Sequence, residues 1–233
     1  MAAGSATALI VAAGSGQRLG AGGPKALVEV AGRPMYEWSV DAFASAETVG
    51  RTIVAVPAGH QAGFGAPGVE LVEGGATRSH SVESGLALVE TELVVVHDAA
   101  RPLLTPELVD AAAAMLDADP DIDAVIAAAP VTDTVKRVNR AGVVEATLDR
   151  GELRSVQTPQ VFRTRALRQA MASGDLEKAT DDAFLIESAG GSVGVLEAPV
   201  SNIKVTVASD VGLAEHLLAR QATDKPSPQE STT

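Results

Sequence analysis

The sequence TALIVAAGSGQRLG, residues 7–20, joins an apolar run to a glycine-rich turn. The run at residues 7–12 is short and almost wholly apolar, which is typical of a strand buried on both faces of a parallel sheet. In the turn that follows, closely spaced glycines let backbone N–H groups surround the oxygens of a phosphate. This stretch therefore predicts an α/β fold in which the first strand leads into a loop that binds an anion.

Similar apolar runs alternate with helical patterns along the chain. We expect further strands at residues 52–57, 93–97, 124–129, 192–196 and 202–207. We expect helices at residues 34–46, 79–89, 106–117, 164–173 and 180–190, and a last helix capped by Ser209. Strands that alternate with helices form right-handed βαβ units, and ligands then bind at the carboxyl ends of the strands. The pattern predicts a Rossmann-like, mostly parallel sheet flanked by helices.

The segment at residues 131–156 departs from this pattern. β-branched and polar residues alternate over residues 131–135, residues 139–142 have the composition of a turn, and residues 143–148 are again strand-like. The segment therefore predicts a protruding β-hairpin arm. Because a two-stranded ribbon is only marginally stable alone, a second copy of the protein is its simplest support, and we expect a homodimer.

The composition excludes several classes of protein. The 233 residues carry 18 Lys and Arg against 30 Asp and Glu, a net charge of −12, and only 3% are aromatic. We therefore expect neither a basic surface for a nucleic acid backbone nor a platform for base stacking. The absence of Cys excludes disulfides, thiolate zinc sites and cysteine nucleophiles. The longest apolar runs are too short to span a membrane.

The length is enough for one α/β domain with its own core. We assign residues 1–220 to this domain, which includes the arm, and residues 221–233 to a disordered tail, because that stretch is polar and contains proline. The first residues, MAAGS, lack the positive charge of a secretory signal, so we expect a cytoplasmic protein.

The loop after the first strand carries two cations. Leu19 stands where the dinucleotide fingerprint needs a glycine, and Lys25 follows Pro24 where a P-loop has glycine, so neither motif is present. Arg18 and Lys25 lie seven residues apart, on either side of a turn rich in glycine and proline, so both can reach one anion. The alternative is a surface loop with two solvated cations.

A second glycine-rich stretch, residues 74–82, precedes a predicted helix, where small residues allow a ligand to approach closely. An ordinary N-cap by Ser79 or Ser81 explains the same residues. At the end of the third buried strand, Asp98 can bind a ribose hydroxyl or a divalent metal, unless it pairs with Arg101.

Three other positions carry polar groups that need an explanation. Thr180, followed by Asp181 and Asp182, is a candidate ligand-binding residue, although an N-cap with acids in the first helical turn explains the same pattern. Lys204 lies between two apolar residues of a predicted strand, so its ammonium group needs a partner or a ligand. We expect His97 to be a hydrogen-bonded structural histidine rather than a base.

Taken together, eight segments resemble the 2-C-methyl-D-erythritol 4-phosphate cytidylyltransferases of the non-mevalonate isoprenoid pathway. They occur in the family's order from about Ala6 to Arg220, and their joint occurrence is far more specific than any one of them. The segments are AAGSGQRLGAGGPKAL (12–27), GGATRSHSVESGL (74–86), VHDAARP (96–102), APVTDTVKR (129–137), LDRGEL (148–153), QTPQVF (157–162), TDDA (180–183) and NIKVT (202–206).

The resemblance implies a nucleotidyltransferase-type fold and a defined reaction. CTP and 2-C-methyl-D-erythritol 4-phosphate would give 4-diphosphocytidyl-2-C-methyl-D-erythritol and pyrophosphate, with Mg²⁺ as the divalent cation. The attacking phosphate oxygen is already anionic at pH 7, so no general base is needed, and alignment and charge stabilisation can supply the catalysis.

The same resemblance implies roles for residues of this chain. Arg18 and Lys25 would stabilise charge on the α-phosphate, and Arg150 and Lys204 complete the catalytic set. CTP would be bound by Ala12, Ala13, Gly14, Gly16, Gly75, Ser81, Asp98 and Ala99, with Asp98 also the candidate metal ligand. The phosphate of the sugar alcohol would be bound by Thr134, Arg150, Thr180 and Lys204. In this family the arm reaches the neighbouring protomer, so Thr134 and Arg150 would serve that protomer's site.

Three other functions fit parts of the sequence. A ribitol 5-phosphate cytidylyltransferase would share the CTP half and differ in the arm and in the pocket around Thr180 and Lys204. A dimeric nucleotide-binding regulator without turnover would keep the fold, but it has no use for cations at a transition state. A purine nucleotidyltransferase acting on sugars or on the molybdenum cofactor would share the fold but not the arm.

Overall fold

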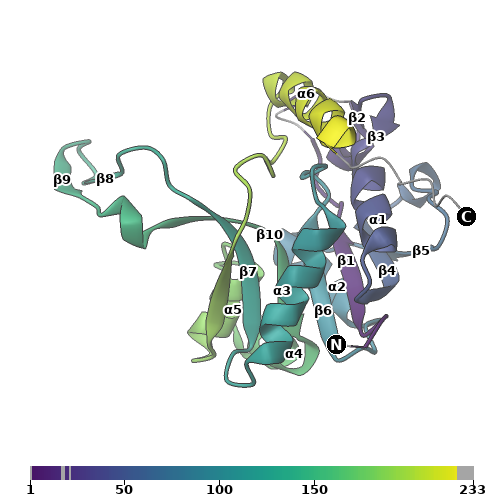
Figure 1. Cartoon of the computed structure of the whole chain (residues 1–233), viewed down its shortest axis with the longest axis horizontal. Helices are drawn as coiled ribbons and strands as arrows, with labels where there is room; N and C mark the ends of the chain where they lie inside the picture. Colours follow the sequence, from purple (N-terminus) through teal and green to yellow (C-terminus); the bar gives the residue numbers. More distant parts are fainter. Residues whose placement is uncertain (1, 17–18, 21, 225–233) are drawn as a thin grey trace, which may run out of the picture.

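A seven-stranded sheet forms the centre of the molecule (Figure 1). The computed structural model describes residues 2–16, 19–20 and 22–224. The strand order is β11-β7-β10-β6-β1-β4-β5, and neighbours are parallel except for β10, which is antiparallel to both β6 and β7. The strands are β1 (Ala6–Val11), β4 (Val49–Val56), β5 (Val69–Glu73), β6 (Leu93–Asp98), β7 (Ala124–Pro130), β10 (Arg154–Arg163) and β11 (Val193–Glu197).

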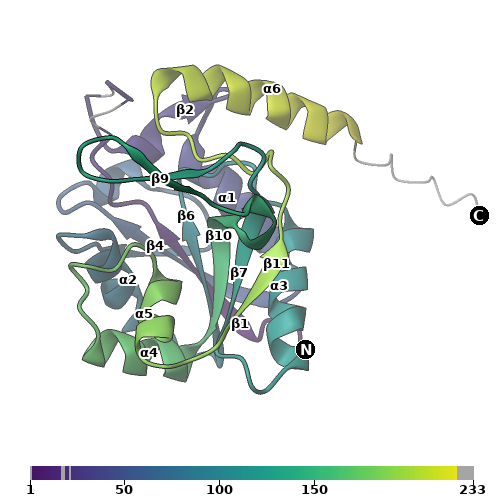
Figure 2. The ribbon, with the colours of Figure 1, turned by 90° about the vertical axis from the view of Figure 1, so that its left-hand side faces the viewer.

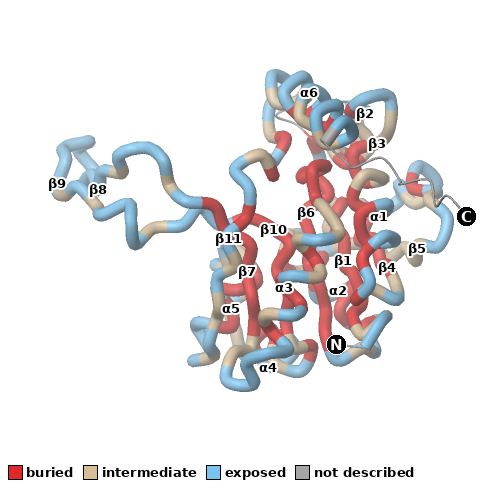
Figure 3. Tube along the Cα trace, in the orientation of Figure 1, coloured by how far each residue is buried: buried red, intermediate tan, exposed pale blue. Residues whose placement is uncertain are grey.

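Helices cover both faces of this sheet (Figure 2). Because successive strand residues point to opposite faces, Ile10 of β1 joins the apolar cluster beneath one helical layer and Leu9 joins the cluster beneath the other. The first layer contains α1 (Met35–Ser45) and α3 (Pro106–Ala118), and the second contains α2 (Arg78–Leu86), α4 (Thr164–Ser173) and α5 (Asp182–Ser188). The central strands are accordingly buried along most of their length (Figure 3). The predicted α/β fold is confirmed.

The last helix, α6 (Ala208–Asp224), packs outside these two layers, against the small hairpin of β2 (Glu29–Val30) and β3 (Arg33–Pro34). A third apolar cluster lies beneath it and includes Leu103 from the loop after β6, Val205 from the segment before α6, and Leu218 of the helix. This cluster fixes the segment before α6 beside the carboxyl end of β6. Within the described residues, no helix is both long enough and apolar enough to span a membrane.

The strand expected at residues 202–207 is not formed. The segment makes no ladder, and its backbone bond to the loop after β6 runs from the Val205 N–H to the Ala100 carbonyl at 2.8 Å. Ile203 and Val205 alternate with polar residues because they pack beneath α6. The pattern that predicted a strand therefore reflects packing against a helix.

Most of β10, a central strand, was not predicted from the sequence. Its residues from Gln157 to Gln160 are buried, and its register against β7 shifts between Val156 and Gln160. Pro159 lies inside this shift, and proline has no N–H for a ladder bond. A proline in the middle of the run is unusual for a central strand, so the sequence pattern did not predict β10. The strand tolerates this proline because its pairing with β7 is irregular there.

Several helix ends differ from the predicted ones. Thr77, not Ser79 or Ser81, caps α2, and Asp181 caps α5, so Thr180 precedes that helix. Ser209 lies inside α6 and does not cap it. Instead, the Asp210 carboxylate accepts the N–H groups of the two residues before the helix, at 2.7 and 3.0 Å.

In the segment expected to form the arm, two short strands pair as a hairpin, and the first of them lies later in the sequence than expected. β8 (Lys136–Val138) pairs with β9 (Val144–Thr147) in antiparallel fashion, and residues 131–135 form a loop. Figure 1 shows the hairpin extending away from the sheet. Three arm valines, Val138, Val143 and Val144, are more than half exposed, at 53, 59 and 55%.

The disordered tail expected at residues 221–233 is corrected in part. Residues 221–224 belong to α6, and residues 225–233 lie outside the described part.

Candidate active site

A cavity of about 670 Å³ lies at the carboxyl ends of β1 and β6. Its walls come from the loop after β1, the start of α2, the loop after β6 and the segment before α6. Parallel strands bring these segments together because their carboxyl ends meet at one edge of the sheet. Of the residues identified in the sequence, the cavity is lined by Ala12, Ala13, Gly14, Gly16, Lys25, Gly75, Ser81, Asp98, Ala99 and Lys204.

The loop after β1 folds back on itself and brings Lys25 to the cavity. The Lys25 N–H donates to the Gly14 carbonyl at 3.0 Å. Gly16 has φ +70°, and a Cβ there would lie 3.0 Å from the Gly23 carbonyl oxygen and 3.1 Å from the Lys25 Cα. A side chain at position 16 would therefore strain the backbone and push the returning chain away. Arg18, expected to act with Lys25, lies outside the described residues.

The second glycine-rich stretch packs directly against the first. A Cβ on Gly74 would lie 2.6 Å from the Cβ of Ala13 and 2.8 Å from the Ser81 hydroxyl oxygen. The Ser81 hydroxyl donates to the carbonyl of Thr77, which caps α2. The two candidate nucleotide-binding segments thus form one continuous wall of small residues and backbone groups.

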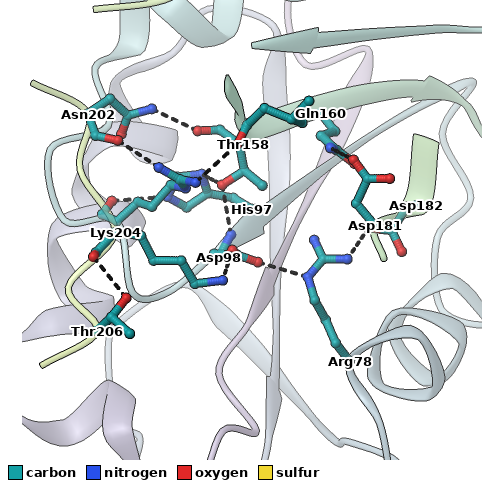
Figure 4. A network of polar contacts seen from close by, with 12 residues as sticks. Arg78, His97, Asp98, Thr158, Gln160, Asp181, Asp182, Asn202, Lys204 and Thr206 are labelled. Carbon is teal, nitrogen blue, oxygen red and sulfur yellow. Dashed lines mark hydrogen bonds and ion pairs between the residues drawn. The ribbon is translucent and has the colours of Figure 1, made fainter. Parts of the chain in front are cut away.

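A chain of alternating charges extends from the cavity wall to the start of α5 (Figure 4). The Asp98 carboxylate accepts from Lys204 Nζ through Oδ2 at 2.7 Å and from Arg78 Nε through Oδ1 at 2.9 Å. Arg78 also donates to the carboxylate of Asp182 at 2.6 Å. Asp98 and Asp182 are 11% and 0% exposed, so both carboxylates depend on these partners for solvation.

The pKa values reflect this pairing. Burial alone would raise the pKa of Asp98, but the nearby charges of Arg78 and Lys204 bring it well below its usual range. Burial opposes the charge of Arg78, yet Asp182 and Asp98 together raise its pKa. For Asp182 burial prevails, and its pKa is raised despite the bond from Arg78. Asp98 is therefore a firmly charged acceptor that holds Lys204 at the cavity wall.

The Arg101 guanidinium makes no hydrogen bond to the Asp98 carboxylate, although the Arg101 backbone N–H donates to the Asp98 carbonyl at 3.0 Å, which corrects the alternative considered for that carboxylate. Its buried guanidinium donates to the carbonyl of Asn202 at 2.8 Å and to the carbonyl of Val156 at 3.5 Å. It thereby ties the base of the arm to the segment that carries Lys204.

His97 is a structural residue, as expected. It is fully buried, its Nε2 contacts the Arg101 carbonyl at 3.1 Å, and its Nδ1 contacts the Thr158 hydroxyl at 2.9 Å. Since a carbonyl only accepts, we assign the proton to Nε2. The Thr158 hydroxyl then donates to Nδ1 and accepts the Asp98 N–H at 3.1 Å. Burial lowers the pKa of His97 to about 4, so the neutral ring fixes the backbone of Asp98 at pH 7.

Three of the expected site residues do not line the cavity of their own chain. Thr134 and Arg150 are exposed on the arm, where the Arg150 guanidinium donates to the Thr132 carbonyl. Thr180 is exposed immediately before the cap of α5. Conversely, no role was expected for Arg78 from the sequence. A half-buried arginine and a buried aspartate can be recognised as a pair only when their spatial proximity is known.

Comparisons with known proteins agree with the fold and the site. The model of the family named 2-C-methyl-D-erythritol 4-phosphate cytidylyltransferase matches residues 6–220. Proteins of that name from Synechococcus sp. (strain CC9902) and Nocardia farcinica (strain IFM 10152) are 43 and 45% identical, over 92 and 94% of this chain and 98 and 96% of theirs. The crystal structure of the protein of that name from Thermus thermophilus has a TM-score of 0.76 and 35% identity, covering 94% of this chain and all of that one.

Replacement of Gly16 should destabilise the folded loop. We expect Gly16→Ala to lower the free energy of unfolding by roughly 1–3 kcal/mol, because of the positive φ and the close contacts to Gly23 and Lys25. Gly22→Ala is the matched control, since Gly22 lies in the same loop and no atom of the described residues outside its chain neighbours lies within 4 Å of its added Cβ. Urea unfolding of both variants checks the prediction, and equal stability of the two would contradict it.

Titration of His97 should make the protein less stable in mild acid. Its folded pKa of about 4 lies below the ordinary 6.5, so the unfolded chain binds a proton in this window that the native state does not. The free energy of unfolding should therefore fall by up to about 3 kcal/mol as the pH drops from 6.5 to 4. His97→Gln, which cannot titrate, should flatten this slope in urea unfolding at several pH values. An unchanged slope would disprove the assignment.

Proposed function

The chain belongs to the 2-C-methyl-D-erythritol 4-phosphate cytidylyltransferase family, and we infer from this that it transfers CMP from CTP to 2-C-methyl-D-erythritol 4-phosphate. The products are 4-diphosphocytidyl-2-C-methyl-D-erythritol and pyrophosphate, and the reaction belongs to isoprenoid precursor biosynthesis. The observation that carries this conclusion is the family match over residues 6–220, which spans every segment that lines the cavity. Because CTP is the donor, we propose that the enzyme works in the cytoplasm.

The reaction needs charge stabilisation more than proton transfer. A phosphate oxygen of the sugar alcohol bonds to the α-phosphorus of CTP as the bond to pyrophosphate breaks, and this oxygen is already anionic at pH 7. Negative charge develops around the α-phosphate, so preorganised cations lower the barrier. Lys25, held over the cavity by the Gly14 carbonyl, supports this role, and Arg18 is proposed to act with it.

The wall of small residues is proposed to bind the nucleoside part of CTP. Gly74 packs against Ala13, so backbone N–H and carbonyl groups of both glycine-rich segments face the ligand without obstruction by side chains. Such groups can form hydrogen bonds with the edge of a pyrimidine base, and a larger purine base would not fit in the same position. The proposed contacts come from Ala12, Ala13, Gly14, Gly16, Gly75, Ser81, Asp98 and Ala99.

The phosphate of the sugar alcohol is proposed to lie near Lys204, beside Thr180. The Lys204 side chain is 41% exposed and held by Asp98, so its ammonium group can donate to a phosphate oxygen as a second partner. Thr134 and Arg150 are proposed to complete this subsite from the arm of the partner in a homodimer. The exposed valines of the arm support a dimer, since exposed apolar side chains gain stability when they pack on a second copy.

Mg²⁺ is proposed to bind at this site together with the phosphates of CTP. Among the described residues, no three His, Asp or Glu side chains converge on a point. Of the described residues that line the cavity, Asp98 alone carries a carboxylate, and each of its oxygens accepts a bond from a cation while keeping a further lone pair. Mg²⁺ is commonly bound through one or two carboxylates together with substrate phosphates. We propose that Asp98 is that carboxylate and that the bound ion would neutralise charge on the triphosphate.

Substrate choice tests the proposed function directly. With Mg²⁺ and CTP, pyrophosphate release should be fast with 2-C-methyl-D-erythritol 4-phosphate and at least about 100-fold slower with ribitol 5-phosphate or when UTP or ATP replaces CTP. Preference for ribitol 5-phosphate would overturn the substrate and keep the CTP site. Binding of CTP without any turnover would favour a nucleotide-binding regulator.

Mixed dimers test whether the arm serves the partner's site. Lys25→Ala and Arg150→Ala should each lower kcat by about 100-fold or more. If Arg150 serves the partner, each mixed dimer contains one intact site and one doubly altered site. Since half of randomly paired dimers are mixed, co-expression should restore about a quarter of the wild-type activity. No recovery in dimers shown to be mixed would place Arg150 in the site of its own chain.

A further inference from the structure

Arg78 links the cavity wall to the start of α5. It is the first residue of α2, directly after the cap Thr77, and its side chain is 26% exposed. Its guanidinium contacts two carboxylates that lie 84 residues apart in the chain, Asp98 at the end of β6 and Asp182 at the start of α5. Figure 4 shows it between them.

Each of the two carboxylates is bonded to, or close in sequence to, a residue that is proposed to bind the sugar-alcohol phosphate. On one side, Asp98 uses Oδ1 for Arg78, which leaves only Oδ2 for Lys204 Nζ. On the other side, Asp182 lies two residues after Thr180. The four charges alternate in the order Lys204, Asp98, Arg78, Asp182, so each of the two buried carboxylates is paired with at least one cation.

The start of α5 has its own internal support. Asp181 accepts the Phe184 N–H at 2.9 Å and the side-chain amide of Gln160 at 2.8 Å. These bonds hold the helix start to β10, but they do not reach the cavity. The Arg78 side chain does reach it, and so links this helix start to the cavity wall.

We propose that Arg78 is a positioning residue of the reaction, which sets Lys204 through Asp98 and Thr180 through Asp182 so that both meet the phosphate of the acceptor. This inference rests on the proposed function and assigns Arg78 no contact with the reacting atoms. Without Arg78, Asp98 has both oxygens free for Lys204 and holds it away from the phosphate. Asp182 is then left as a buried carboxylate without a partner, which displaces the segment that carries Thr180.

The nucleotide half should be far less affected, because Asp98 is the only proposed CTP contact that accepts from Arg78, and it keeps Lys204 as a cationic partner when Arg78 is replaced. The cap of α2 uses the Thr77 side chain and the His80 N–H, which do not involve the guanidinium. The loop that carries Lys25 is held by the Gly14 carbonyl. The proposal therefore predicts that the two substrates respond differently when Arg78 is replaced.

The test uses Arg78→Met and the double variant Arg78→Met with Asp182→Asn, in which the orphaned carboxylate is also removed so that folding is retained. Thermal unfolding verifies the fold, and pyrophosphate release gives KM for each substrate. In both variants, KM for the acceptor phosphate should rise about tenfold or more, and KM for CTP should change less than about threefold.

Arg168→Met is the matched control. Arg168 also links two elements, since it extends from α4 to the carbonyls of Leu86 and Val89 at the other end of α2. Its loss should lower stability and leave both KM values unchanged.

Three outcomes would overturn the proposal: unchanged KM values in the folded double variant, an equal rise for both substrates, or the same split in Arg168→Met. If turnover is too slow to measure, retained CTP binding by calorimetry supports the proposal, and lost CTP binding contradicts it. An inactive wild-type protein would instead refute the proposed function, so the two failures are distinguishable.

Discussion

The fold places the Asp98 carboxylate where it needs cationic partners, and the arrangement of much of the cavity follows from that need. It lies at the end of β6 between two central strands and is 11% exposed, so water cannot solvate it fully. Its two cations come from elements far apart in the chain, Arg78 at position 1 of α2 and Lys204 from the segment before α6. One buried charge therefore fixes two separate walls of the cavity relative to the sheet. The neutral ring of His97 adds to this by holding Thr158 against the Asp98 N–H.

The remaining features support this arrangement from both sides. The third apolar cluster holds Val205 and the loop after β6 beneath α6, which keeps Lys204 within reach of Asp98. On the other side, Gly16 lets the first glycine-rich loop fold back onto itself, and Gly74 lets the second glycine-rich segment pack against Ala13 of the first. The result is a cavity with one wall of backbone groups and one of ordered charges. Such a cavity suits a reaction between two phosphates, in which alignment and charge stabilisation supply the catalysis.

The sequence predicts the features that depend on neighbouring residues. The strand-and-turn pattern at residues 7–20 indicates both the sheet and the loop, and the turn at residues 139–142 indicates the hairpin. Features that depend on distant residues are harder to predict. The sequence shows that Lys204 needs a partner but not that the partner is Asp98, and it gives no signal that Arg78 meets Asp182. β10 is hidden by Pro159, and the alternation around Val205 comes from packing beneath a helix.

An NMR titration of the Asp98 side-chain carboxyl carbon would show whether its two cations keep this carboxylate ionised in the folded protein. We expect Asp98 to stay ionised down to the pH at which the protein unfolds, because Arg78 and Lys204 bring its pKa well below the usual range. Titration of Asp98 in the folded protein near the ordinary value of about 3.9 would contradict this pairing, and with it the fixed relation between the two walls of the cavity.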